Sequence, residues 1–180
     1  MRQAWQMWQS SLSADQCDFF IDRCRKIDPV EGATFNNDSD HRKSSVRWVL
    51  KDDEIHDALW WHVSESNRYA FGFDVTESCS IQFTEYSAES GDKYDWHHDV
   101  DWTSPHAFDR KLSVVIQLSD PKYYEGADFQ FLEVENPQSE ALRAKGTVLV
   151  FPSYLQHRVT SITKGTRYSL VAWFDGPRWR

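Results

Sequence analysis

The chain has 180 residues and a formal net charge of −8, a length sufficient for one domain with a buried core. Hydrophobic residues make up 40% and charged residues 27%, the balance of an ordinary globular protein, but aromatic residues are abundant at 15%. Proteins that bind duplex nucleic acid cluster Lys and Arg, and here no basic run exceeds Arg42-Lys43. We therefore expect a single domain over residues 1–180 that does not take nucleic acid as its main partner.

Cysteine usage and hydropathy indicate where the protein works. The chain has an odd number of cysteines, at Cys17, Cys24 and Cys79. Two of them fall at helical spacing, which favours core thiols in a reducing compartment. No apolar run approaches the length of a transmembrane helix, and the first residues lack the pattern of a secretion signal. The prediction is a cytoplasmic protein without a membrane partner.

The N-terminal part predicts two helices between about residues 13 and 70. Residues 1–11, rich in Gln and Trp, predict a first strand or a loosely packed arm. Ser13 and Gln16 form a capping-box pattern, and apolar residues then recur at helical spacing until Pro29 ends the helix. Their positions are Cys17, Phe20, Ile21, Cys24 and Ile27.

Residues 31–45 have no periodicity and predict a strand fragment and a mobile loop, followed by a strand over Val46–Leu50. A lid over a substrate is one role for this loop, and a solvated charged segment is the other. The second helix begins after Asp52 or Asp53 and ends where Gly72 breaks the run. Its apolar face contains Ile55, Leu59 and Val63.

From Ser78 onward the pattern is that of β-strands separated by turn signals. Two helices followed by many short strands predict a mainly β fold, a helix-backed sandwich or jelly roll with its core over about residues 78–175. The expected strands are 80–84, 112–118, 129–132, 147–151, 158–162 and 168–174.

One polar stretch, Asp95 to Asp101, contains a metal-ligand pattern. His97 and Asp99 stand two apart, so on an extended strand both side chains point to one face. With His157 as a third ligand they would form the two-histidine, one-carboxylate facial triad of non-heme Fe(II) oxygenases. The alternatives are a solvated polar turn, or a ligand at His98, although His98 would point away from the face of Asp99.

Arg167 follows His157 at a spacing that suits a strand, a turn at Lys164-Gly165 and a returning strand. This arrangement would place a fixed cation near the metal, where a dicarboxylic co-substrate could bind. The alternative is an exposed basic residue at the end of a hairpin.

These motifs resemble a known family. Gly91-x-x-Tyr94-x-x-His97-x-Asp99, with Tyr86 upstream, is similar to the 2-oxoglutarate- and Fe(II)-dependent dioxygenases of the prolyl 4-hydroxylase-like group. Phe151-Pro152, His157-x-Val159, Gly165-Thr166-Arg167-Tyr168-Ser169-Leu170 and Trp173-Phe174 resemble that family's C-terminal signature. The resemblance implies a double-stranded β-helix, which is a cupin-like jelly roll with the metal between its two sheets.

The resemblance also implies the roles of individual residues. His97, Asp99 and His157 would bind Fe(II), with no catalytic residue beyond these ligands, and Arg167 would pair with the distal carboxylate of 2-oxoglutarate. Ser169 could add a hydroxyl to that contact, and Tyr86 matches a tyrosine that hydrogen-bonds the co-substrate, unless it is a rim aromatic. Gln117 stands where many relatives carry a Tyr that touches 2-oxoglutarate, and its amide could still donate a hydrogen bond. Tyr94 matches a tyrosine that borders the substrate pocket, and Trp173 is the second substrate-binding candidate.

The remaining aromatic residues and histidines have weaker assignments. Trp96, Trp102 and Trp173 could wall the pocket, but aromatic residues at such spacing are more often core residues. The other histidines have no partner at ligand spacing and are interpreted as surface or helix-face residues: His41, His56, His62 and His106.

By resemblance, the function is hydroxylation of a prolyl residue in a peptide or protein, with release of succinate and CO₂, and ascorbate could support turnover. Asp99 favours hydroxylation, because related halogenases lack this carboxylate. Two alternatives stay open. One is a jelly-roll module that binds a small ligand without redox chemistry. The other is a hydroxylase of the same superfamily acting on a free amino acid or on nucleic acid.

Overall fold

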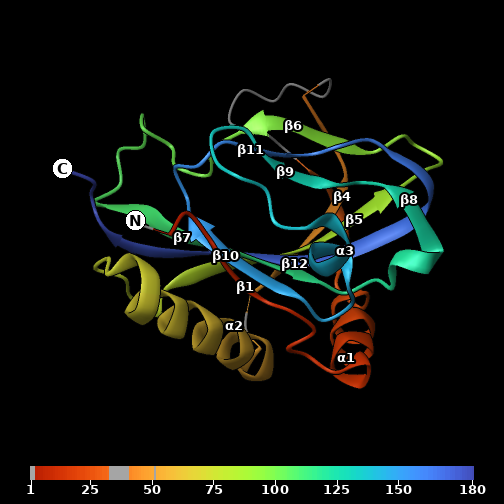
Figure 1. Cartoon of the computed structure of the whole chain (residues 1–180), viewed down its shortest axis with the longest axis horizontal. Coiled ribbons are helices and arrows are strands. Elements are labelled where there is room, and N and C mark those ends of the chain that lie inside the picture. Colours follow the sequence, from red (N-terminus) through yellow and green to blue (C-terminus); the bar gives the residue numbers. More distant parts are fainter. Residues whose placement is uncertain (1–2, 33–40, 51) are drawn as a thin grey trace.

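Two antiparallel β-sheets lie face to face in the computed structural model, which describes residues 3–32, 41–50 and 52–180 (Figure 1). The larger sheet has the order β1 (Gln6–Trp8), β10 (Val148–Pro152), β7 (Phe108–Gln117), β12 (Ile162–Pro177), β5 (Cys79–Ser87), β4 (Ser45–Val49) and β2 (Val30–Glu31), with β8 (Tyr124–Gly126) paired to β12. The smaller sheet has the order β3 (Arg42–Lys43), β6 (Lys93–His97), β11 (His157–Val159) and β9 (Phe129–Phe131). This architecture confirms the predicted double-stranded β-helix.

Helices α1 (Ala14–Cys24) and α2 (Asp53–Ser66) cover the outer face of the larger sheet, opposite the smaller sheet (Figure 1). A π-helical turn over Asn67–Phe71 extends α2 to Gly72, which is left-handed with φ 66°. The chain also has a 3-10 turn at Pro121–Tyr123 and a short helix α3 (Ser139–Arg143). Among the described residues, no helix is both long and apolar enough to cross a membrane.

The predicted helix starts are confirmed. Ser13 caps α1, and Gln16 returns the hydrogen bond to the Ser13 backbone, as a capping box requires. Asp52, rather than Asp53, caps α2 by accepting from the Ile55 N–H at 3.2 Å. The predicted end of α1 near Pro29 is wrong, because the helix stops at Cys24 with Arg25 as its C-cap.

The region predicted as a strand fragment and loop contains strands at both of its ends, β2 and β3. The first strand is also confirmed, since β1 pairs with β10 at the edge of the larger sheet. The lid proposed within residues 31–45 falls mainly on residues 33–40, outside the described residues.

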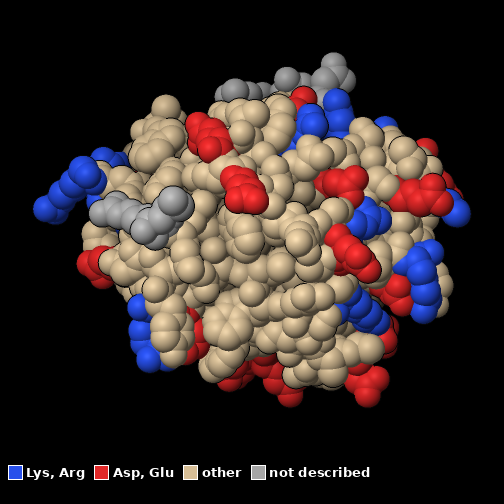
Figure 2. Space-filling model, in the orientation of Figure 1, with Lys and Arg blue, Asp and Glu red and all other residues tan. Residues whose placement is uncertain are grey.

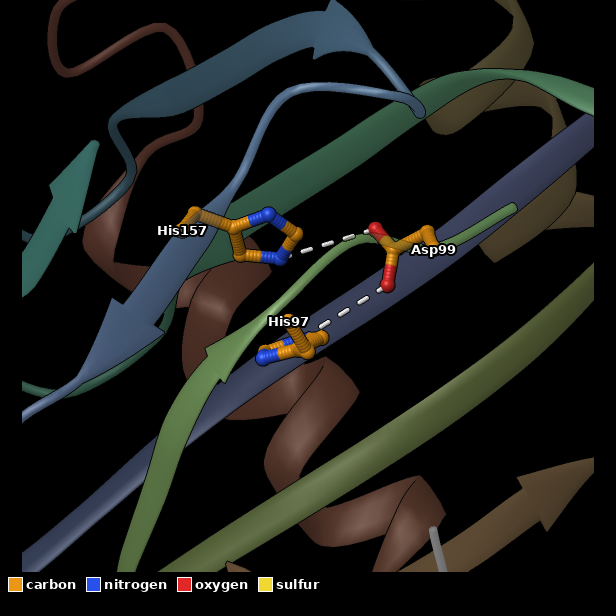
Figure 3. A group of neighbouring side chains, drawn as sticks. All are labelled: His97, Asp99 and His157. Carbon is orange, nitrogen blue, oxygen red and sulfur yellow. Dashed lines mark ion pairs between the residues drawn. The ribbon is translucent and has the colours of Figure 1, made fainter. Parts of the chain in front are cut away.

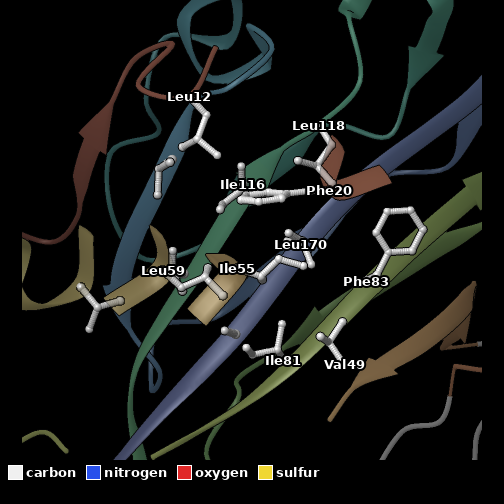
Figure 4. Packing of buried hydrophobic residues seen from close by; sticks show 14 of the residues in the cluster. Leu12, Phe20, Val49, Ile55, Leu59, Ile81, Phe83, Ile116, Leu118 and Leu170 are labelled. Carbon is white, nitrogen blue, oxygen red and sulfur yellow. The ribbon is translucent and has the colours of Figure 1, made fainter. Parts of the chain in front are cut away.

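Strand β12 shows how one strand serves two environments. Leu170, Ala172 and Phe174 face the helices and belong to the apolar core between α1, α2 and the larger sheet (Figure 4). The residues between them alternate to the opposite face, toward the smaller sheet. The same alternation holds in β7, where Leu112, Val114 and Ile116 face the helices. A second apolar cluster fills the space between the two sheets around Phe129, Phe131 and Phe151.

The expected hairpin between His157 and Arg167 is wrong. β11 pairs with β6 and β9 in the smaller sheet, whereas β12 pairs with β5, β7 and β8. The chain therefore crosses between sheets after Val159. Gly165 lies inside β12 with φ 71°, and a Cβ there would collide with the backbone oxygen of Tyr123, so this glycine permits a close strand approach rather than a reversal.

Charged side chains on the surface are mixed in sign. On the face shown in Figure 2, acidic side chains gather along the edge formed by the two long helices, and basic side chains elsewhere alternate with acidic ones. That face has no continuous basic area.

Candidate metal and co-substrate site

Two neighbouring strands of the smaller sheet bring the candidate histidines together. His97 is the last residue of β6, His157 is the first residue of β11, and the two are paired in register. Asp99 lies just beyond β6, so the expectation of one continuous strand through both His97 and Asp99 is wrong. A bend after His97 nevertheless turns the carboxylate back toward both imidazoles (Figure 3).

The three side chains converge on one point. His97 Nε2 lies 3.7 Å from Asp99 Oδ1, and His157 Nε2 lies 3.6 Å from Asp99 Oδ2. One ligand atom from each residue falls within 4.8 Å of the other two. This spacing could hold a metal ion, and two nitrogens with one carboxylate oxygen are the donor set that suits non-heme Fe(II).

Backbone carbonyls fix the orientation of both rings. His97 Nδ1 is 2.7 Å from the Asp95 carbonyl oxygen, and His157 Nδ1 is 2.9 Å from that of Leu155. Each Nδ1–H therefore donates to a carbonyl, which leaves the lone pair on Nε2, directed at the candidate site. Tyr94 stacks on the His97 ring at 3.4 Å between centroids, and this contact limits ring rotation.

The electrostatics favour the ligating forms of these groups. Burial, together with neighbouring His157, lowers the pKa of His97 to about 3, although Asp99 opposes the shift. Burial alone would raise the pKa of Asp99, but His157, His97 and Arg110, together with a hydrogen bond from Ser113, outweigh it and lower that pKa. At neutral pH His97 is thus a neutral imidazole and Asp99 a carboxylate, as metal binding requires.

Two serines that sequence reasoning missed support Asp99. Ser113 Oγ donates to Asp99 Oδ2 at 2.6 Å, and Ser153 Oγ lies 2.9 Å from Ser113 Oγ. Because the single Ser113 proton goes to Asp99, Ser153 must donate to Ser113. The Asp99 backbone N–H also donates to the Ser153 carbonyl at 2.8 Å. The sequence feature that could have revealed this support is Ser113 itself, because it is a polar residue within the apolar run of β7.

A pocket opens between the two sheets at this point. Its lining contains every predicted site residue except Gln117: Tyr86, Tyr94, His97, Asp99, His157, Arg167, Ser169 and Trp173. Of the other candidate tryptophans, Trp102 is 57% exposed and Trp96 packs under Arg158, so neither belongs to the lining. Of the four remaining histidines, His62 lies in α2, which fits the helix-face interpretation, and it is buried.

Arg167 lines the pocket and is buried, with 2% of its surface exposed. Its Nε and Nη2 donate to Gln117 Oε1 at 3.1 and 2.9 Å, and its Nη1 has no hydrogen-bond partner among the described residues. A buried guanidinium nitrogen with an unused donor fits a carboxylate ligand, because leaving such a donor unpaired is costly. Ser169 lies two residues further along the same face of β12.

Gln117 itself lies behind Arg167 and not in the pocket wall. The structure thus places it in contact with the guanidinium rather than in direct reach of the pocket. Three polar residues that the sequence did not single out do line the pocket: Arg42, Gln82 and Thr84. Arg42 comes from β3 and donates to Gln82 of β5 at 2.7 Å. Only pairing between distant strands reveals this contact.

Comparison with known proteins assigns the family. The profile of the 2OG-Fe(II) oxygenase superfamily matches residues 81–175. The chain belongs to this superfamily. PKHD-type hydroxylases from Synechococcus sp. (strain CC9311) and Gloeothece citriformis are each 33% identical, over 82 and 94 residues. These matches cover 46% and 52% of this chain, but only 36% and 41% of the two relatives.

Solved structures share the fold. A viral collagen prolyl hydroxylase from Paramecium Bursaria Chlorella virus-1, in a 2OG complex, matches with TM-score 0.74 at 17% identity and covers 97% of both chains. A Pseudomonas putida prolyl-4-hydroxylase matches with TM-score 0.74 at 20% identity over 98% of this chain and 94% of its own. The family and the fold agree with each other, and the superfamily's metal and co-substrate fit the donor set and the buried arginine described above.

Proposed function

We propose that the chain is an Fe(II)- and 2-oxoglutarate-dependent hydroxylase in which His97, Asp99 and His157 hold the metal and Arg167 holds the distal carboxylate of 2-oxoglutarate. The observation that carries the proposal is the presence of three converging ligand atoms, within 4.8 Å of one another, in the same pocket as a buried guanidinium with an unused donor. When bound, Fe(II) and 2-oxoglutarate supply O₂ activation through decarboxylation to succinate and CO₂.

The protein's own residues would prepare this chemistry. The backbone carbonyls of Asp95 and Leu155 hold both imidazoles with Nε2 toward the metal, so the ligands need no reorientation on binding. Ser113 fixes the Asp99 carboxylate, and the apolar surroundings of Phe129 and Val115 limit water in the pocket. The carboxylate ligand favours hydroxylation over halogenation, since it occupies the position that a halide would need.

The substrate we propose is a prolyl residue of a peptide or protein. Support comes from the relatives, which carry the name PKHD-type hydroxylase, and from the fold shared with prolyl hydroxylases. One such structure, from Trichoplax adhaerens, is a prolyl hydroxylase in complex with a hypoxia inducible factor peptide fragment, with TM-score 0.72 and 16% identity. In this chain, Tyr94 and Trp173 form aromatic walls beside the candidate metal ligands, which would suit a proline ring.

Two measurements test the proposal. Anaerobic titration with Fe(II) and 2-oxoglutarate should produce a weak charge-transfer band in the visible range, and absence of the band would favour a non-catalytic binding module. Incubation of a peptide library with the protein, iron, ascorbate and 2-oxoglutarate should yield products heavier by one oxygen. The control is Asp99→Ala, which should yield no such products.

A further inference from the structure

The partner of Arg167 is unusual for a buried cation, because it is neutral. A guanidinium this deeply buried commonly pairs with a carboxylate, which offsets the cost of removing the charge from water. Arg167 forms no ion pair with Asp or Glu among residues 3–32, 41–50 and 52–180, and both of its hydrogen bonds go to one amide oxygen, Gln117 Oε1. The guanidinium also lies over the Tyr86 ring, with Cζ 5.5 Å from the ring centroid. Among the described residues, the positive charge of Arg167 thus has neutral partners and no carboxylate.

Gln117 is held firmly in place by its backbone. Its N–H donates to the Thr147 carbonyl at 2.9 Å, and its carbonyl accepts from the Gly146 N–H at 2.7 Å. Gly146 has φ 81°, and a Cβ there would collide with the Leu12 backbone oxygen, so the tight turn requires glycine. Gln117 also pairs with Ser169 across β7 and β12. The amide therefore approaches Arg167 from a rigid strand end.

We propose that Gln117 is a positioning residue for co-substrate binding. It fixes two nitrogens of Arg167, so that Nη1 and the full positive charge remain available for the distal carboxylate of 2-oxoglutarate. This inference rests on the proposed function and assigns Gln117 a role through Arg167 instead of a direct contact. The neutrality of the amide is the essential property: a glutamate of the same shape would accept the same two hydrogen bonds but would cancel the charge that attracts the ligand.

The test is Gln117→Glu, measured by calorimetric titration of the Mn(II)-loaded full chain with 2-oxoglutarate and, separately, with pyruvate. Pyruvate carries the 2-oxo acid group without the distal carboxylate, so it reports the metal end of the site alone. We expect the dissociation constant for 2-oxoglutarate to rise about tenfold or more, while that for pyruvate stays unchanged. Gln117→Met leaves the positive charge of Arg167 in place but removes the hydrogen-bond acceptor Oε1. The dissociation constant for 2-oxoglutarate should therefore rise less, by about threefold.

A matched control lies elsewhere in the chain. Gln130 Oε1 accepts from Arg158 Nε at 2.9 Å, which is a second glutamine–arginine pair, and neither residue lines the pocket. Gln130→Glu should leave both affinities unchanged. Near-ultraviolet circular dichroism of each variant verifies the fold. If Gln117→Glu does not fold, Gln117→Met is the test: it should lose affinity for 2-oxoglutarate and keep its affinity for pyruvate.

Unchanged 2-oxoglutarate binding in folded Gln117→Glu would overturn the inference, and so would an equal loss of pyruvate binding, because the effect would then not pass through Arg167. Failure of the proposed function looks different. In that case the unaltered protein would bind 2-oxoglutarate no more tightly than pyruvate, a comparison in which Gln117 is not varied.

Discussion

The two faces of the larger sheet come from the same strands but have different roles: one packs against the helices and the other lines the pocket. On β12, the face toward the helices carries Leu170, Ala172 and Phe174, all fully buried and apolar. The other face carries Arg167, Ser169 and Trp173 in the pocket. Burial of apolar groups stabilises the fold, whereas burial of polar groups without full pairing costs stability and is retained where it serves binding. Substitutions on the two faces should therefore separate stability from activity.

The largest effect is expected from His157→Ala on the pocket side. Loss of one of three ligands should lower hydroxylation by about three orders of magnitude or more and should weaken Mn(II) binding. Product formation and metal titration measure the two effects. His56→Ala on α2, outside the pocket, is the control and should retain activity. Full activity of His157→Ala would contradict the assigned ligand set.

Next in size is Arg167→Ala, which should raise the 2-oxoglutarate concentration for half-maximal turnover about a hundredfold, since the charged anchor of the distal carboxylate is lost. Metal affinity should be unchanged, because the ligands are untouched. Steady-state kinetics with varied 2-oxoglutarate, together with Mn(II) titration, gives both values. The assignment of Arg167 fails if co-substrate dependence is unaltered.

Adjacent residues of β12 offer the most direct comparison of the two faces. Leu170→Ala removes a fully buried side chain from the helix-facing core and should cost about 2–5 kcal/mol of unfolding free energy. Ser169→Ala, one residue earlier on the pocket face, should cost less than about 1 kcal/mol. Urea unfolding of both variants checks the difference. Equal losses would mean that the pocket face also stabilises the fold.

The smallest expected effect is on the pH dependence of stability, and it comes from a histidine in α2, on the side of the larger sheet that the helices cover. His62 in α2 is buried, with Nδ1 donating to the Ala58 carbonyl at 2.6 Å and Nε2 lying 2.9 Å from Ser11 Oγ. Burial lowers the pKa of His62, despite the opposing Ala58 contact. As pH falls below about 6.5, the unfolded chain takes up a proton that the folded chain resists, so stability declines.

His62→Gln should reduce this decline, which urea unfolding at several pH values between neutrality and about pH 5 would measure. The difference between the variant and the unaltered chain isolates His62, because His97 titrates in both. An identical slope in the two proteins would show that His62 does not contribute to the pH dependence.

Local sequence patterns predicted much of this molecule. The Ser13–Gln16 capping box, the cap at Asp52 or Asp53 and the strands within β5, β7 and β12 each depend on residues a few positions apart. The family motif likewise directed attention to His97, Asp99, His157 and Arg167. Errors arose at the ends of elements and between them, as at Cys24 and at the crossing from β11 to β12, where packing of distant segments decides.

By itself, then, the sequence determined the fold class, the helix starts, the two-sided strands and the identity of the candidate ligands, because backbone geometry and side-chain period act over short separations. Only the tertiary structure decided that Ser113 and Ser153 support Asp99, that Arg42 enters the pocket beside Gln82, and that Gln117 holds Arg167 from behind. These contacts join strands that are far apart in the chain, and their partners become neighbours only when the two sheets close on each other and exclude water from the polar groups between them.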